Sequence, residues 1–156
     1  MLLVNLPASA QLSDDTSTFT GLVAASCSFD GFRDSYPMIW YDAVNYLRSS
    51  AHFNVITNLP SVRIRVSQVA TISESAGLSG AAIDVDAYLY QKDSSNRSFL
   101  KATATKSSSA TTDLLDMSFG NGIRLDAVVL TANRVNNLYQ IGPGEYSYTV
   151  TISCLL

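Results

Sequence analysis

Apolar and polar residues alternate one by one along most of the chain, which is the pattern of β-strands with one buried face. Turn signals such as Asp30-Gly31 and Gly120-Asn121-Gly122 interrupt this alternation, so that it predicts strands over residues 18–29, 53–57, 61–72, 83–91, 99–106, 114–119, 123–133 and 146–154. No internal repeat or linker divides these segments. About seven to nine short strands at this spacing predict an all-β fold, a β-sandwich, in one domain.

Residues 36–50 are the stretch in which the pattern is ambiguous. Pro37 comes shortly after Asp34-Ser35, as it would at the start of a helix, and several apolar residues lie near helical spacing: Ile39, Ala43, Tyr46 and Leu47. The aromatic residues of this stretch fit a strand or an irregular loop equally well. A short helix, a strand and a loop therefore all remain open here.

The first dozen residues carry the clearest alternation. The even positions are all apolar, whereas the odd positions between them are polar or proline except for Leu3; the even set is Leu2, Val4, Leu6, Ala8, Ala10 and Leu12. Pro7 lacks a backbone donor, so this strand is not expected at the centre of its own sheet. A polar spacer follows, and we interpret the segment as a detachable arm; the alternative is an edge strand of the same domain.

The same residues invite comparison with a secretory signal peptide. Ala8-Ser9-Ala10 has the A-x-A form of a cleavage site. However, no basic region precedes it, and Asn5 and Pro7 interrupt an apolar stretch that is already short. The strand interpretation accounts better for the strict period of two.

Composition and charge exclude several classes of protein. The 156 residues include 10 basic and 13 acidic side chains, with a net charge of −3, and only 15% of them are charged. A nucleic-acid binder would need a basic patch, and a membrane span would need about 18 consecutive apolar residues. We therefore expect no nucleic-acid partner and no membrane span. The 22 serines and 12 threonines are typical of a strand-rich chain.

Candidate catalytic chemistry is sparse. His52 is the only histidine and lies in no nucleophile motif, and no glycine-rich loop precedes a predicted helix. We expect no catalytic, cofactor-binding or metal-binding residues, and a protein that is not an enzyme. Asp84 and Asp86 share a strand face and fit a solvated surface better than a cation site. Exposed tyrosines could stack on sugars, although tyrosine is common in strands anyway: Tyr41, Tyr88 and Tyr90.

Two cysteines lie near opposite ends of the chain. Cys27 and Cys154 match no zinc or redox spacing. We interpret them as one disulfide of an exported protein, and the alternative is two buried free thiols. A bridge that closes so long a loop would stabilise the fold by about 4–5 kcal/mol in the chain-entropy model.

Two segments resemble a known family. Residues 19–29, FTGLVAASCSF, resemble the first strand of chaperone–usher-type pilin subunits and of the related spore-coat-U-like domains, in which Phe-x-Gly-x-Val and small residues precede a cysteine and an apolar residue. Residues 144–152, GEYSYTVTI, are similar to the closing strand of the same subunits. The two motifs occur in the same order as in the family, whereas the middle of the chain agrees with the family only in the spacing of its predicted strands.

This resemblance implies an immunoglobulin-like β-sandwich that is incomplete, missing one strand, with an N-terminal donor-strand arm. Residues 1–17 would be the arm and its spacer, and residues 18–156 the pilin domain. In such subunits the arm of one copy fills an apolar groove between the first and last strands of the next. The even-numbered arm residues would be the donor strand, and the acceptor groove would be lined by Phe19, Gly21, Val23, Ala25, Tyr146, Tyr148, Val150 and Ile152.

The implied function is that of a structural subunit of an extracellular, cell-surface filament, a pilus or fimbria. Identical subunits would join head to tail by donor-strand exchange. The family implies an assembly chaperone and an outer-membrane usher as further partners, although the chain ends without the near-terminal tyrosine of many chaperone-recognised subunits. Two alternatives are a carbohydrate-binding or adhesive β-sandwich and a virion coat or tail protein.

The cysteines depart from the family pattern. Family members usually place the second cysteine after the second strand, whereas here it lies in the final one. A donor strand between the first and last strands would hold them about 9–10 Å apart, whereas a disulfide needs Cα atoms within about 7 Å. Either the donor strand stops short of Cys27 and Cys154, or the bridge is absent or intermolecular.

Overall fold

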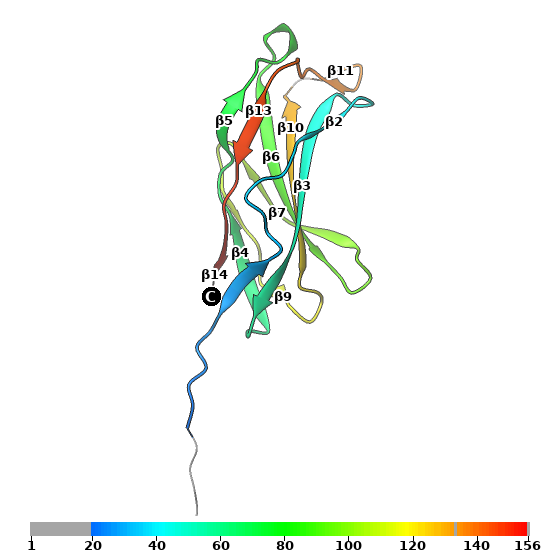
Figure 1. Ribbon diagram of the computed structural model, residues 1–156. Coiled ribbons are helices and arrows are strands. Elements are labelled where there is room, and N and C mark those ends of the chain that lie inside the picture. Colours follow the sequence, from blue (N-terminus) through cyan, green and yellow to red (C-terminus); the bar gives the residue numbers. More distant parts are fainter. Residues whose placement is uncertain (1–19, 133, 156) are drawn as a thin grey trace, which may run out of the picture.

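The alternating segments form antiparallel strands in the part of the chain that the structure describes, residues 20–132 and 134–155 of a computed structural model (Figure 1). No α-helix occurs among these residues, and Leu78–Gly80 form a single 3₁₀ turn. The predicted all-β fold is confirmed. The strands are β1 Cys27–Asp30, β2 Ile39–Tyr41, β3 Tyr46–Thr57, β4 Ser61–Val66, β5 Ala70–Glu74, β6 Ile83–Lys92, β7 Ser98–Thr105, β8 Ala110–Thr111, β9 Leu115–Asp116, β10 Gly122–Thr131, β11 Arg134–Val135, β12 Leu138–Tyr139, β13 Tyr146–Thr149 and β14 Ile152–Leu155.

The main sheet has the strand order β1-β3-β10-β6-β7, with β2 paired to β3 at one end. β10 lies between β3 and β6, and its Leu125 is opposite Ala51 on one side and Leu89 on the other. All three side chains are buried. Because side chains alternate across a strand, the neighbouring residues of β10 point to the outer face of the sheet.

An opposite layer of two small sheets covers the inner face of the main sheet. One has the order β14-β4-β8, with β9 also paired to β4, and the other consists of β13 and β5. The inward residues of β4, Val62, Ile64 and Val66, are at most 1% exposed. Each such burial contributes about 1.5–3 kcal/mol to folding. The hydrophobic core therefore lies between the main sheet and the opposite layer.

Several predicted strands agree with the structure to within two residues. β6, β7 and β10 coincide closely with the predicted segments 83–91, 99–106 and 123–133, and 53–57 lies within β3. The predicted turn after β6 forms because Asp93 accepts hydrogen bonds from the backbone of Ser95 and Arg97, at 2.9 and 2.8 Å. Asn96 takes a left-handed conformation with φ of 63°, which asparagine tolerates better than most residues.

Of the alternatives left open for residues 36–50, the structure shows strands joined by a turn and no helix. This stretch contains β2 and the start of β3, which are joined by a turn in which Asn45 has φ of 52°. The rings of Tyr41 and Tyr46 stack across the hairpin with centroids 4.9 Å apart. Cross-strand aromatic pairs stabilise a hairpin. The spacing of apolar residues along the chain does not show that such a pair will form.

Two long predicted strands are each broken in the middle. β4 ends at Val66 because the backbone then leaves the sheet: Ser67 N donates to Thr151 O at 2.8 Å, and Val69 N donates to Thr105 O at 2.9 Å. The predicted strand 146–154 breaks at the same level into β13 and β14. The predicted strands 18–29 and 114–119 are regular only in β1 and β9 among the described residues.

Candidate functional site

A lateral groove of about 660 Å³ runs beside β13, between residues 144–150 and the connection 32–38 that follows β1. Its floor is mostly apolar, with Ser49 as a polar member, and comes from β3 and β10 of the main sheet and β5 of the opposite layer. Leu125 and Ala51 are buried there, whereas Ile72 is 67% exposed. The floor residues are Leu47, Ser49, Ala51, Ile72, Leu125 and Ala127.

The strands that flank the lateral groove have free edges. β13 pairs with β5 on one side and with no other strand in the described residues, and β1 pairs in the same way with β3 alone. Figure 1 shows β13 and β14 following one side of the molecule. An edge strand presents unpaired N–H and C=O groups, which is a template for another strand.

The disulfide closes one end of the lateral groove. Cys27 in β1 and Cys154 in β14 are bonded, with Cα atoms 6.1 Å apart, and the predicted bridge is confirmed as intramolecular. A third strand between two others would need about 9–10 Å, so none fits at this level. The lateral groove starts beyond it, with Val150 on one side and Phe32 on the other. Of the alternatives left by the sequence, an absent bridge and an intermolecular bridge are both wrong.

At its other end the lateral groove opens into an apolar hollow of about 380 Å³. The two cavities share Leu47, Gly144 and Tyr146. The hollow adds Trp40 and Pro143, and Trp40 is 43% exposed. An apolar surface thus continues along the free edge of β13 beyond its first residue.

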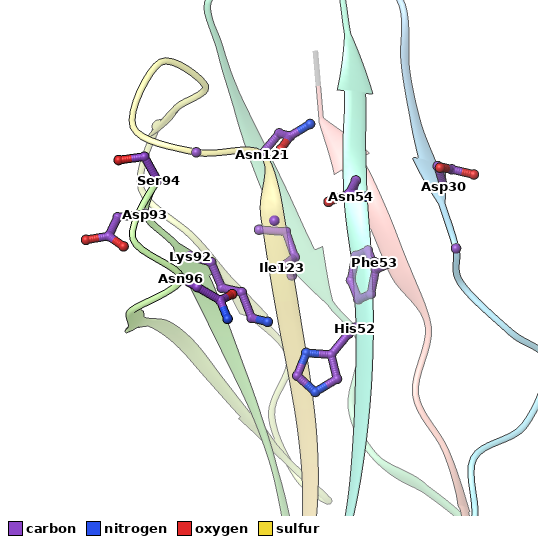
Figure 2. A pocket seen from close by; sticks show the side chains of 13 residues that line it. Asp30, His52, Phe53, Asn54, Lys92, Asp93, Ser94, Asn96, Asn121 and Ile123 are labelled. Carbon is purple, nitrogen blue, oxygen red and sulfur yellow. The ribbon is translucent and has the colours of Figure 1, made fainter.

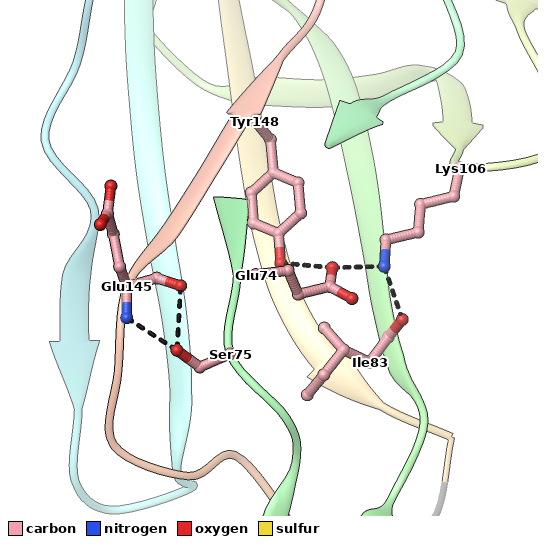
Figure 3. A network of polar contacts seen from close by, with 6 residues as sticks. All are labelled: Glu74, Ser75, Ile83, Lys106, Glu145 and Tyr148. Carbon is pink, nitrogen blue, oxygen red and sulfur yellow. Dashed lines mark hydrogen bonds and ion pairs between the residues drawn. The ribbon is translucent and has the colours of Figure 1, made fainter. Parts of the chain in front are cut away.

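A polar network fixes β13 against β5 (Figure 3). Tyr148 Oη donates a hydrogen bond of 2.8 Å to Glu74 Oε2, and Lys106 forms an ion pair with the same oxygen. Lys106 Nζ also donates to Ile83 O at 2.9 Å. Burial, together with the Glu74 carboxylate, raises the pKa of the Tyr148 hydroxyl well above its usual value, so the phenol stays protonated. The free edge of β13 is therefore held in a defined place.

The start of β13 depends on a close approach between two backbones. Gly144 has φ of 150°, and a Cβ atom added to it would lie 1.8 Å from Ser75 Oγ. Next to it, Glu145 N donates to Ser75 Oγ at 2.9 Å, and Ser75 N donates to Glu145 O at 3.0 Å. Only glycine fits between the two segments.

Gly144→Ala is expected to lower the free energy of unfolding by about 1–3 kcal/mol, because the methyl group must displace Ser75 and the backbone conformation disfavours any other residue. Urea denaturation measures the change. Gly21→Ala is the matched control, since no atom lies within 4 Å of its added Cβ. Equal stability of the two variants would contradict this account of the contact.

Some of the residues predicted to line the acceptor groove lie together in the structure. Tyr146, Tyr148 and Val150 line the lateral groove, whereas Ile152 packs against the core beyond it. Gly21, Val23 and Ala25 are exposed and lie outside it, with Val23 83% exposed. Phe19 and the six predicted donor residues lie outside the described residues.

The side of the lateral groove opposite β13 was missed by sequence reasoning. It consists of the irregular connection 32–38, in which Tyr36 and Met38 pack against the core and Phe32 lies edge to face with Phe53 at 5.1 Å. The sequence signal that could have indicated this wall is the high apolar and aromatic content of the connection. Its apolar residues do not follow the spacing of a strand or of a helix. The floor residue Leu125 was inside a correctly predicted strand.

A second, polar hollow of about 380 Å³ lies at one end of the main sheet (Figure 2). Its lining includes His52, Lys92 and Asn121. Burial, with the positive charges of Lys92 and Arg124 nearby, lowers the pKa of His52, so the imidazole is neutral at pH 7. The described residues contain no group of three or more His, Cys, Asp or Glu side chains that could hold a metal ion.

The sequence matches no protein-family model and no curated protein. None of the helical segments in the described part of the chain has the length and apolar character required to cross a membrane. The lateral groove and the free edge of β13 beside it are the features of the described residues that bear most directly on function.

Proposed function

We propose that this chain is a structural, non-enzymatic subunit of an extracellular filament, polymerised by donor-strand complementation. The domain is an immunoglobulin-like sandwich that lacks one strand. The arm formed by residues 2–12 of one subunit adds that strand to the next. The observation that carries the proposal is the free edge of β13 beside an apolar lateral groove.

The dimensions of the lateral groove agree with such an occupant. Its wall along β13 covers residues 144–150, a length of about 23 Å for extended chain. The arm is longer, about 36 Å when extended. An incoming strand would therefore place three or four of its alternate side chains in the lateral groove, and the remainder could reach the apolar hollow beside Trp40.

The energy available is sufficient for stable association. Burying three leucine and valine side chains, as Leu2, Val4 and Leu6 would be, contributes about 5–9 kcal/mol. Backbone hydrogen bonds to the free edge of β13 add to this and set the direction of the strand. The total is comparable with the stability of an entire domain.

The arrangement favours an open chain of subunits. Arm and lateral groove are formed by different parts of the chain, so the contact is heterologous and produces a filament when the rotation between subunits does not close a ring. Residues 13–26 connect the arm to β1 and span at most about 50 Å when fully extended. Leu22, in this connection, is 95% exposed.

The test is a pair of matched double variants in the arm, with filaments measured by negative-stain electron microscopy and sedimentation. Val4→Asp/Leu6→Asp places charges on the apolar face and is expected to abolish filaments, because a buried carboxylate costs several kcal/mol. Leu3→Asp/Asn5→Asp places them on the other face and should leave filaments intact. Long filaments from the first variant, or an intact mass showing that native filament subunits begin after Ala10, would overturn the proposal.

A further inference from the structure

The outer face of the main sheet carries a hollow of about 300 Å³, which we call the tyrosine–arginine hollow. Its walls are four partly exposed tyrosine rings from β3, β6 and β12: Tyr46, Tyr88, Tyr90 and Tyr139. Arg48, Arg124 and Arg134 lie among them. Aromatic rings and guanidinium groups gathered in one concave place are the elements of a polar ligand site.

Two of the arginines are held in place by one buried carboxylate. Asp126, with a side chain only 3% exposed, accepts hydrogen bonds from Arg48 at 2.6 Å and from Ser50 Oγ at 2.7 Å. Arg124 Nε lies 3.2 Å from the same carboxylate, without the alignment of a hydrogen bond. Two cations thus share one anion, and the Arg48 Nε donor is buried with no acceptor among the described atoms.

The third arginine has no neutralising carboxylate among the described residues. Arg134 lies over the Tyr139 ring, 4.0 Å from its centroid, and donates a hydrogen bond to the Tyr139 hydroxyl. No carboxylate of the described residues lies within 4.0 Å of it. The guanidinium is oriented by an aromatic ring, and no acid in the described part of the chain is paired with its charge. The hollow is therefore lined by three arginines and one carboxylate, and the carboxylate of Asp86 lies beside one wall, where it accepts a hydrogen bond of 2.7 Å from Tyr88 Oη.

We propose that the tyrosine–arginine hollow binds an acidic saccharide, a sugar unit that carries a carboxylate. A pyranose has an apolar C–H face that can lie on a tyrosine ring, and tyrosine hydroxyls can bond to its hydroxyl groups. Arg134 would receive the carboxylate, since the planar guanidinium matches its two oxygens. A volume of about 300 Å³ is at the lower end of ligand pockets and suits one or two sugar units.

The site is independent of the lateral groove. Arg124 and Asp126 of β10 line the hollow, whereas the alternate residues Leu125 and Ala127 line the lateral groove, so the two sites lie on opposite faces of one strand. Each subunit of a filament would then display one copy of the hollow. Many weak sites on one filament bind a glycan-coated surface far more strongly than one site does.

The experiment measures saccharide binding to the full chain by isothermal titration calorimetry. The acidic probes are 3′-sialyllactose and trigalacturonic acid, and the neutral counterparts are lactose and maltotriose. At least one acidic probe is expected to bind saturably and at least about fivefold more tightly than its neutral counterpart, and more weakly in 0.5 M salt because charge is screened.

Arg134→Gln is the diagnostic variant and Arg63→Gln, on the exposed face of β4, is its matched control. Arg134→Gln is expected to weaken acidic-probe binding about tenfold with unchanged thermal unfolding, because the side chain is exposed and unpaired with any described acid. Arg63→Gln should bind as the wild type does. No saturable binding of either acidic probe, equal binding of the neutral sugars, or unchanged binding by Arg134→Gln would overturn the inference, and none of these results depends on filament formation.

Discussion

Ile72→Asp is expected to abolish filament growth while leaving the subunit folded. Ile72 lies on the floor of the lateral groove and is 67% exposed in the isolated chain, so its replacement should change stability by no more than about 0.5 kcal/mol. In a filament the same position would be covered by the arm of a neighbour. A carboxylate buried there without a partner costs several kcal/mol, enough to prevent the association.

Ile56→Asp is the control for this variant. Ile56 is also a strand isoleucine, 51% exposed, but it lies in β3 and lines none of the cavities beside β13. Thermal unfolding checks that both variants fold, and sedimentation and negative-stain microscopy measure filaments. Filaments of normal length from Ile72→Asp, or equal loss from Ile56→Asp, would mean that the lateral groove is not where subunits join.

Removing the disulfide is expected to have the largest effect on the stability of the subunit. Cys27 and Cys154 are separated by 127 positions, and opening a loop of that length lowers the free energy of unfolding by about 4–5 kcal/mol in the chain-entropy model. This is a large fraction of the stability of an ordinary domain. The comparison is between the wild type and Cys27→Ser/Cys154→Ser, by urea denaturation followed through the fluorescence of Trp40.

Two controls accompany the disulfide variant. Wild-type protein reduced with dithiothreitol should match the double variant, and Ser153→Ala, at an exposed position beside Cys154, should match the oxidised wild type. A loss below about 1 kcal/mol would contradict the expectation, since it would mean that the unfolded chain gains little freedom when the bond is broken.

The strands of the core could be predicted because their signal is local. β6 and β10 alternate strictly and end at turn residues, and the face shared by Tyr146, Tyr148, Val150, Ile152 and Cys154 in the last segment packs against the core as expected. The break between β13 and β14 could not be predicted, because it depends on hydrogen bonds between Ser67 and Thr151, 84 positions apart.

The lateral groove is even less accessible to sequence reasoning. It exists because β13 and β1 each have one strand neighbour among the described residues. The alternation of apolar and polar residues in a strand does not reveal whether one or both of its edges are paired. One wall comes from the connection 32–38, whose residues Tyr36 and Met38 reach the core from an irregular backbone. The last-strand side of the lateral groove was found through family resemblance alone.

The residues that form the tyrosine–arginine hollow on the outer face could not be predicted from the sequence either. Tyr88 and Tyr90 stand out in the sequence, but their arginine neighbours come from other strands. Arg124 lies directly opposite Tyr90 in the register of β10 and β6, with its guanidinium 4.3 Å from the ring centroid. The pairing register between strands that are distant in the chain decides which side chains meet. That register cannot be predicted from a single sequence.

The position of the disulfide has a mechanical consequence for a filament of the proposed kind. Pulling on such a filament would load each subunit where the arm leaves it, just before β1, and where a neighbour's arm is gripped, along β13. The bond between Cys27 and Cys154 joins β1 covalently to β14, whose first residue follows the last residue of β13 by three positions. Tension would therefore pass from one subunit to the next through one covalent link and a few residues of strand, and the chain between the cysteines could not be drawn out while that bond remains intact.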